Sequence, residues 1–206
     1  MSKDLLALVA DVQQEKTVAT LLHERQPSLG IRPLSFDIFR HPRNDPGVYH
    51  EAAAFLAPYG SAYDYALVVL DAAWEGAPGG AAALRQSLVE SLQRSGWAPD
   101  RCQVVVIDPE LEMWVWADSP VVAEVLRTPW EEMRALAKQS GYWRQGQAKP
   151  QEPKALLEAV LRQQRRPRSA AIFQELARRL GLASCTDPAF VLLRETLAKW
   201  FGTLED

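Results

Sequence analysis

Apolar residues along this chain gather in short runs that alternate with longer amphipathic stretches. Continuous apolar runs at residues 5–9, 66–70 and 103–107 predict buried strands, and an alternating run at 34–39 predicts another. Apolar residues at helical spacing predict helices over residues 17–24, 49–56, 81–95, 121–127, 130–140, 154–164, 169–180 and 189–200. Buried strands that alternate with helices are typical of parallel sheets. The sequence therefore predicts an α/β fold with a mostly parallel sheet, helices on both faces and a C-terminal helical extension.

Segments rich in proline and glycine separate these elements. They are HPRNDPG at 41–47, GAPGG at 76–80 and GYWRQGQAKPQEP at 141–153, and each predicts a loop. Residues 111–116, which follow a proline turn, are expected to open a further helix. The longest loop suggests an α/β domain over residues 1–140 and a basic helical extension packed on it over residues 141–206.

The composition suits one such unit. The chain has 206 residues, 48% of them apolar, which is enough for a sizeable core. Cys102 and Cys185 lack metal-ligand spacing and are expected to be free thiols. No apolar run approaches the length of a membrane span. We therefore expect a cytoplasmic protein with no membrane partner.

The net charge is only −3, but basic residues far outnumber acidic ones from 134 to 180. The densest run is RQQRRPR at 162–168. Such an asymmetry points to an anionic partner, although two solvated faces of opposite charge would give the same pattern. We predict a nucleic-acid contact, and its candidate residues are Lys154, Arg162, Arg165, Arg166 and Arg168.

Acidic residues follow three of the predicted strands. They are Asp11 with Glu15, Asp71 with Glu75, and Asp108 with Glu110 and Glu112. The carboxyl ends of parallel strands meet at one edge, where ligands bind in such sheets. Carboxylates there would suit Mg²⁺ or Mn²⁺, and a bound metal could activate water. Acids also follow strands because they cap the next helix, so both interpretations stand.

Five stretches together resemble a known family. They are VADVQQEKTVATLL (9–22), LDAAWEG (70–76), PELEMWVWAD (109–118), PKALLEAVL (153–161) and CTDPAFVLLRETL (185–197). PELEMWVWAD is the most specific of them. Together they resemble the small Toprim-related family found beside bacterial defence genes, over most of the chain. LDAAWEG also resembles the phosphoacceptor motif of response-regulator receivers, but VADVQQE lacks the doubled acid of that pattern.

The Toprim resemblance implies metal-dependent phosphodiester hydrolysis in bacterial defence. Asp71, Glu75 and Glu110 would be catalytic. Asp11, Glu15, Asp71, Glu110 and Glu112 would hold Mg²⁺ or Mn²⁺. Two positions depart from the family pattern, because Ala10 stands where its glutamate aligns and Ala73 where its second aspartate belongs. The departures favour a second hypothesis, a non-catalytic accessory subunit that binds nucleic acid or another defence-system protein.

Overall fold

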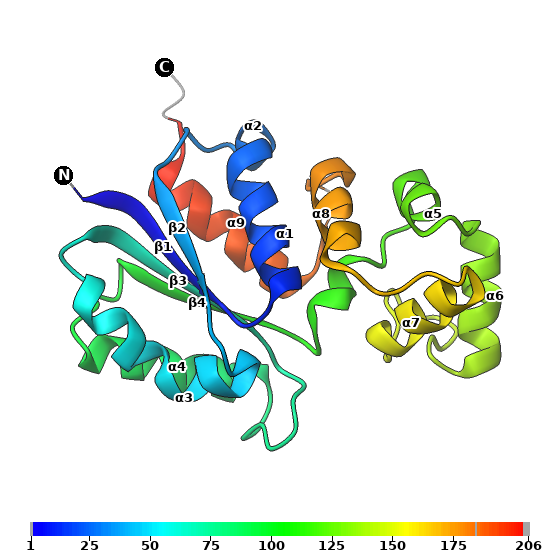
Figure 1. The fold of residues 1–206 in the computed structure, drawn as a ribbon, viewed down its shortest axis with the longest axis horizontal. Helices are drawn as coiled ribbons and strands as arrows, with labels where there is room; N and C mark the ends of the chain where they lie inside the picture. The colour runs from blue at the N-terminus through cyan, green and yellow to red at the C-terminus, as the bar shows by residue number, and fades with distance from the viewer. Residues whose placement is uncertain (1, 184, 204–206) are drawn as a thin grey trace.

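The computed structural model describes residues 2–183 and 185–203, and its centre is a parallel sheet. In these residues four strands pair in the order β2-β1-β3-β4 (Figure 1). They are β1 (Lys3–Val9), β2 (Phe36–Arg40), β3 (Tyr63–Asp71) and β4 (Cys102–Ile107), and every pairing is parallel. The predicted α/β fold with a parallel sheet and helices on both faces is confirmed.

The helices that connect the strands divide between the two faces of the sheet. Helix α1 (Val12–Glu24) links β1 to β2, α3 (Asn44–Leu56) links β2 to β3, and α4 (Ala81–Arg94) links β3 to β4. The chain moves one way across the sheet on the first crossover and the other way on the next two. Right-handed crossovers then require α1 on one face and both α3 and α4 on the other. We call these the first and the second face (Figure 1).

Side chains along each strand alternate between the two faces. In β1, Leu5, Ala7 and Val9 belong to the core on the first face, whereas Leu6 and Leu8 belong to the core on the second. Successive side chains of a strand point to opposite sides, so strands that are apolar throughout must be covered on both. The predicted continuous apolar runs reflect this double burial.

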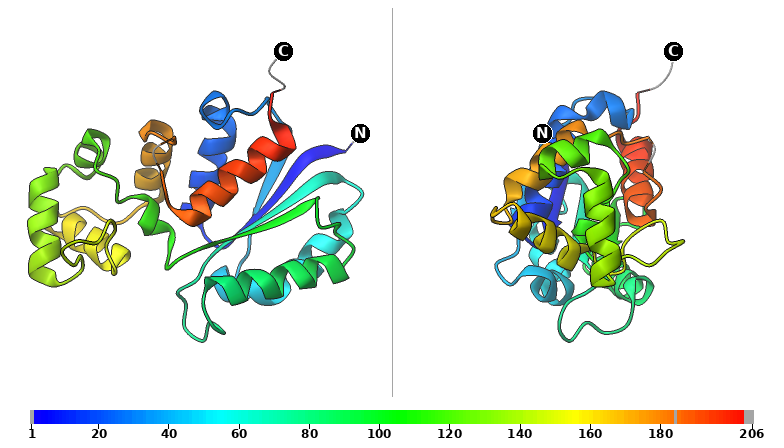
Figure 2. Two further views of the ribbon diagram at one scale, coloured as in Figure 1. Left: turned by 180° about the vertical axis from the view of Figure 1, so that it is seen from behind. Right: turned by 90° about the vertical axis from the view of Figure 1, so that its right-hand side faces the viewer.

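Two C-terminal helices complete the first face. Helix α8 (Ala170–Arg179) packs on α1, and α9 (Pro188–Phe201) packs on β4. A short helix α2 (Gln26–Leu29) lies near the end of α9, and Ile31 forms an isolated bridge with Gly202. The last part of the chain therefore lies beside an early part (Figure 2). The division into two domains at residue 140 stays a prediction. Helices α8 and α9, from beyond that residue, pack directly on α1 and β4.

The remaining helices form a lobe beyond the carboxyl ends of the strands (Figures 1 and 2). The chain leaves β4 through a short 3₁₀ helix, η2 (Leu111–Trp114), and enters α5 (Pro120–Leu126), α6 (Trp130–Ser140) and α7 (Pro153–Gln163). We call α5–α7 the helical lobe. Trp116 is fully buried there, and its indole donates to the carbonyl of Pro153 at 3.0 Å. Another 3₁₀ helix, η1 (Ala57–Tyr59), precedes β3.

The expected loop at 41–47 was wrong in its second half, because α3 begins at Asn44. Its Asn-Asp-Pro-Gly sequence was interpreted as a turn, yet proline is also well tolerated in the first turn of a helix. Gly47 is buried against the ring of His41, and a Cβ at this position would lie 2.0 Å from His41 Nδ1. The glycine therefore serves close packing inside a helix. The expected helix at 111–116 is the shorter η2.

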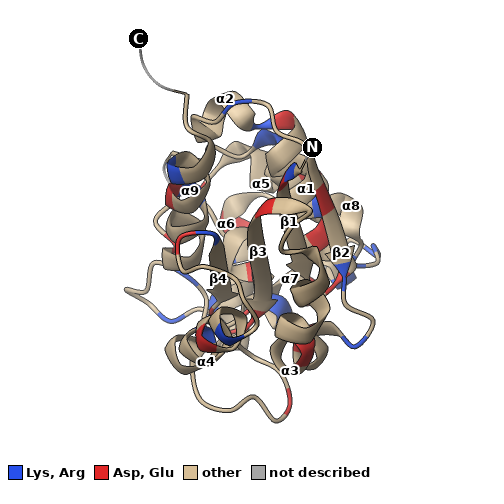
Figure 3. Ribbon diagram, turned by 90° about the vertical axis from the view of Figure 1, so that its left-hand side faces the viewer, with Lys and Arg blue, Asp and Glu red and all other residues tan. Residues whose placement is uncertain are grey.

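The surface carries charges of both signs, and the two cysteines lie partly or fully inside the protein. Acidic and basic residues are interspersed over the end of the molecule shown in Figure 3. Cys102 is buried and Cys185 half-buried, and both are free thiols. Across residues 2–183 and 185–203, no helix combines the length and apolar character needed to span a bilayer.

Candidate functional site

The strand order places a topological switch point between β1 and β3. The first crossover leads from β1 to one side of the sheet, and the later ones lead to the other side. Ligand sites of such sheets lie at the carboxyl ends of the strands that flank this point. Asp11 follows β1 and Asp71 ends β3, so both stand at the switch point. The candidate site is built around Asp71.

Asp71 is held by hydrogen bonds from two different elements. Its Oδ1 accepts from Nε2 of Gln14 in α1 at 3.0 Å and from the backbone amide of Leu111 at 3.1 Å. Its own backbone amide donates to Oδ1 of Asp45, in the first turn of α3, at 2.8 Å. Asp71 therefore ties β3 to helices on both faces of the sheet.

Five acids converge around this point. Burial raises the pKa of Asp71 well above its ordinary value of 3.8, and nearby negative charges raise it further. Those charges belong to Asp45, Glu112, Asp11 and Glu110, in order of effect. Burial also raises the pKa of Asp45, Glu110 and Glu112. We call Asp11, Asp45, Asp71, Glu110 and Glu112 the acidic cluster.

Asp11 is the N-cap of α1. Its Oδ1 accepts from the backbone amide of Gln14 at 2.8 Å. The side chain of Gln14 reaches back, and its Oε1 accepts from the amide of Ala10 at 2.9 Å. This arrangement is close to a capping box, in which a cap residue and the residue three positions later satisfy two helix-start amides. The contacts of Asp11 are therefore those of a helix cap.

Glu110 accepts a hydrogen bond from the N-terminus of another helix, α7. Its Oε1 accepts from the backbone amide of Lys154, in the first turn of α7, at 3.1 Å. Nζ of Lys154 lies 4.0 Å from Oε2 of the same carboxylate. A carboxylate at a helix N-terminus satisfies a free amide and complements the helix dipole. Glu110 therefore fastens the helical lobe to the end of β4.

Glu112 and Arg168 form an ion pair at the base of the lobe. The Glu112 side chain is only 1% exposed, and that of Arg168 is 25% exposed. The guanidinium of Arg168 also lies 5.4 Å from the ring centroid of Phe173 in α8. The Glu112 pKa is raised by burial, while Arg168 acts to lower it. A residue expected to hold metal and one expected to hold nucleic acid are thus partners of each other.

Glu15 and Glu75 lie apart from this cluster. Glu15 faces Lys16 and Arg40, whose charged nitrogens lie 3.9 Å and 3.7 Å from its carboxylate. Glu75 is exposed in the loop after β3. Ala73 is also exposed, and its backbone amide donates to the carbonyl of Pro109 at 2.8 Å.

The acidic cluster does not have the geometry of a metal centre. Among residues 2–183 and 185–203, no three His, Cys, Asp or Glu side chains are arranged to hold an ion. The carboxylates instead accept from amides, pair with Arg168 or Lys154, or repel one another. The residues present therefore do not fit Mg²⁺ or Mn²⁺ as they are arranged.

Four arginines line a separate cleft at the end of α7. The cleft has a volume of about 420 Å³ and is lined by Glu158, Leu161, Arg162, Arg165, Arg166 and Arg168. Arg162 and Arg165 are exposed, and in the described part of the chain neither side chain has a hydrogen-bond or ion-pair partner. Arg166 donates to the carbonyl of Val125 at 2.8 Å, and Arg168 is held by Glu112. We call these four residues the arginine cleft.

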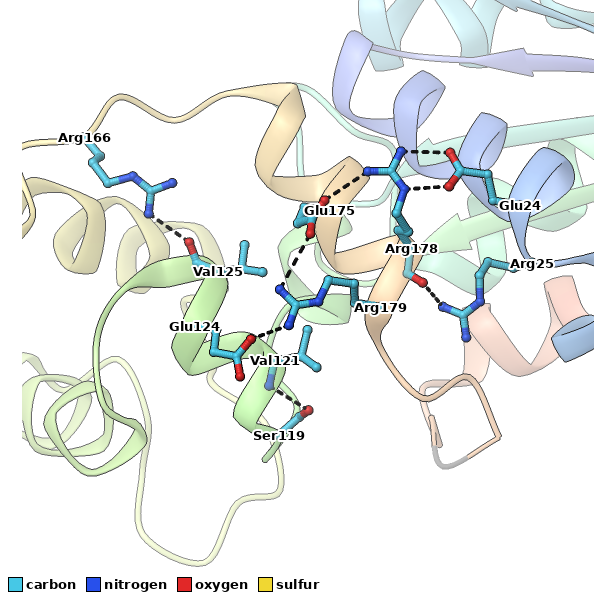
Figure 4. A network of polar contacts seen from close by, with 10 residues as sticks. All are labelled: Glu24, Arg25, Ser119, Val121, Glu124, Val125, Arg166, Glu175, Arg178 and Arg179. Carbon is cyan, nitrogen blue, oxygen red and sulfur yellow. Dashed lines mark hydrogen bonds and ion pairs between the residues drawn. The ribbon is translucent and has the colours of Figure 1, made fainter.

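Other cations of the basic region are used inside the fold (Figure 4). Arg178 of α8 donates to both carboxylate oxygens of Glu24 in α1, and Arg179 pairs with Glu124 of α5. Arg25 donates to the backbone carbonyls of Ala177 and Arg178. This network holds α8 between the sheet unit and the lobe. The basic composition from 134 to 180 therefore combines structural arginines with others, among them Arg162 and Arg165, whose side chains have no partner in the described residues.

Sequence interpretation did not single out Gln14 and Asp45. Gln14 stands three residues after Asp11, which is the spacing of a capping box and could have indicated its role. Asp45 lies in the segment interpreted as a loop, and no sequence signal places it beside Asp71. Comparison of the chain with protein-family models, with curated proteins and with solved structures finds no match.

Proposed function

We propose that this protein is a non-catalytic binding protein that holds nucleic acid in the arginine cleft. The observation that carries the proposal is the pair Arg162 and Arg165, which are both exposed, line one cleft and have no side-chain partner in the described residues. Guanidinium groups match the geometry of phosphate oxygens through two parallel N–H donors. A bacterial defence context remains an expectation drawn from the sequence resemblance.

The neighbouring arginines support this proposal as parts of the cleft wall. Arg166 and Arg168 are half-buried and anchored, to the Val125 carbonyl and to Glu112 respectively. Their positive charge still lies beside Arg162 and Arg165, because all four line the same cleft. Glu158 is the one acid among the described lining residues. The excess of positive charge favours a polyanion over a neutral ligand.

Removing the two unpartnered arginines is expected to weaken nucleic-acid binding. The double variant Arg162→Gln/Arg165→Gln should lower affinity, and the slope of log K against log salt should fall by about one for each lost phosphate contact. Fluorescence anisotropy with single-stranded DNA, duplex DNA and RNA, each at several salt concentrations, measures both quantities.

A matched control removes the same charge elsewhere. Arg85→Gln/Arg94→Gln changes two exposed arginines of α4, on the second face. This control should bind as the wild type does. If both double variants weakened nucleic-acid binding equally, the interaction would depend only on net charge, and the cleft would not be the site. Absence of nucleic-acid binding by the wild type, with a protein captured through the cleft instead, would favour a protein partner.

Metal-dependent phosphodiester hydrolysis is the second candidate, and the convergence of four other acids on Asp71 favours it. Their present partners argue against it. We therefore expect no saturable heat on titration with Mg²⁺ or Mn²⁺ at millimolar concentration, and no cleavage of nucleic acid with either ion. Saturable binding that is lost in both Asp71→Asn and Glu110→Gln, together with metal-dependent cleavage, would replace the first proposal with the second.

A further inference from the structure

A second cavity, distinct from the arginine cleft, lies between α1, η2, α8 and α9. Its volume is about 310 Å³, at the lower end of the range for small-molecule sites. The wall includes Trp114 and Trp116, with Phe173 and Phe190 from the C-terminal helices. It shares no lining residue with the arginine cleft. A ligand in this cavity would therefore bind independently of nucleic acid in the arginine cleft.

The aromatic side chains present apolar surface to this cavity. The indole N–H of Trp114 donates to Oδ1 of Asp187 at 2.9 Å, and that of Trp116 donates to the carbonyl of Pro153. The hydroxyl of Thr17, another lining residue, donates to the Gln13 carbonyl at 2.8 Å. These polar hydrogens are already used, so the wall favours a hydrocarbon or aromatic body.

Lys149 supplies a cation to the same cavity. It is half-buried, and its Nζ donates to the carbonyl of Met113 at 2.9 Å. An ammonium has three donors, which leaves two for other acceptors. Within the described residues no carboxylate forms an ion pair with Lys149. Burial lowers its pKa, and the nearby Cys185 and Asp187 oppose this effect.

The acids near the cavity have other partners or face water. Asp187 caps α9, and its Oδ1 accepts from the amides of Ala189 and Phe190 as well as from Trp114. Asp118, the one carboxylate among the described lining residues, is exposed to water. A half-buried ammonium at an apolar cavity thus has no carboxylate of the described residues within ion-pair distance, and burial makes such a charge costly until it is paired.

We propose that this cavity binds a small amphipathic carboxylate, with its apolar body against Trp114, Trp116 and Phe173 and its carboxylate on Nζ of Lys149. A single ammonium is a compact point charge that suits one carboxylate. A phosphate group would be expected to draw on several cations or a forked guanidinium.

Matched probes with one chain length test the proposal. Octanoate, octanol and octylamine share the apolar body and differ in the head group. Octanoate should bind most tightly and octylamine most weakly, measured by calorimetry and by the change in intrinsic tryptophan fluorescence, to which the two tryptophans of the wall contribute. Lys149→Met should weaken octanoate about tenfold, the equivalent of one charged hydrogen bond, and leave octanol unchanged. Lys138→Met, at an exposed position of α6, is the control and should not alter either affinity.

A cavity-filling variant locates the apolar body. Ala177 of α8 lines the cavity, and Ala177→Phe should abolish binding of both octanoate and octanol. Near-ultraviolet circular dichroism checks that this variant folds, and if it does not, the head-group comparison in Lys149→Met decides alone. Failure of octanoate to bind the wild type, or equal octanoate affinity in Lys149→Met, would overturn the proposal. Neither result depends on whether the arginine cleft binds nucleic acid.

Discussion

Replacing Asp71 with alanine is expected to lower the free energy of unfolding by about 2 to 5 kcal/mol, because two buried donors would lose their acceptor. Those donors are Nε2 of Gln14 and the backbone amide of Leu111, and both use Oδ1 of Asp71. A buried donor without a partner costs about 1 to 3 kcal/mol. Denaturant unfolding monitored by circular dichroism measures the loss.

Replacing Asp71 with asparagine is instead expected to raise the free energy of unfolding near neutral pH. Asparagine keeps an acceptor oxygen for Gln14 and Leu111, and it carries no charge among the other acids. The raised pKa of Asp71 means that the native state binds the proton more tightly than the unfolded chain does. The contribution of this group to stability is therefore lost as pH rises above 3.8 and through the raised pKa.

The difference in unfolding free energy between Asp71→Asn and the wild type isolates this contribution. It should favour the variant at about pH 8 and shrink toward about pH 4, where both side chains are neutral. Asp118→Asn, which changes an exposed carboxylate, is the control and should change the free energy of unfolding little. If Asp71→Asn were less stable than the wild type at every pH, the site would need a negative charge, and a bound cation would become the better explanation.

Replacing Arg168 with methionine is expected to destabilise the fold by about 3 kcal/mol, because Glu112 would remain buried without its counter-ion. This value is at the low end for buried pairs, since a quarter of the Arg168 side chain is exposed. Arg165→Met, in the same segment, has no protein partner to lose in the described residues and should cost little. Guanidinium unfolding of the two variants makes the comparison.

A double-mutant cycle with Glu112→Met tests the pairing itself. The double variant Glu112→Met/Arg168→Met should recover most of the loss, because no buried charge is then left unpaired. In Arg168→Met the pKa of Glu112 loses the influence that lowers it, so this variant should lose stability further as pH rises. Additive single effects that do not change with pH would contradict a coupled pair.

Much of the fold follows from local pattern. Buried strands such as 66–70 are apolar on both faces, and Gly96 ends the pattern of α4 within a residue or two of the observed end. The start of α3 was misplaced because Asn, Asp, Pro and Gly serve both turns and first helical turns. The packing of α8 on α1 and of α9 on β4 could not be foreseen, since it joins residues far apart in the sequence, as Arg178 and Glu24 show for α8.

The candidate site was only partly foreseeable. Parallel topology brings acids after different strands to one edge, and Asp11, Asp71 and Glu110 do meet there. What each carboxylate does there depends on its partners, which lie far away in sequence. Glu112 pairs with Arg168 and Glu110 meets the start of α7, and no periodicity encodes either contact. The metal and catalytic roles implied by the Toprim resemblance stay predictions.

Because of the order of elements along the chain, the two faces of the sheet are covered at different times during synthesis. The second face can close once β4 is made, because α3 and α4 lie between the strands they connect. The first face has only α1 until α8 and α9 emerge, and the entire helical lobe is translated before them. Apolar surface that stays open on a nascent chain is where aggregation begins. The interval between β4 and α9 is therefore the stage at which the apolar first face of the sheet is least covered.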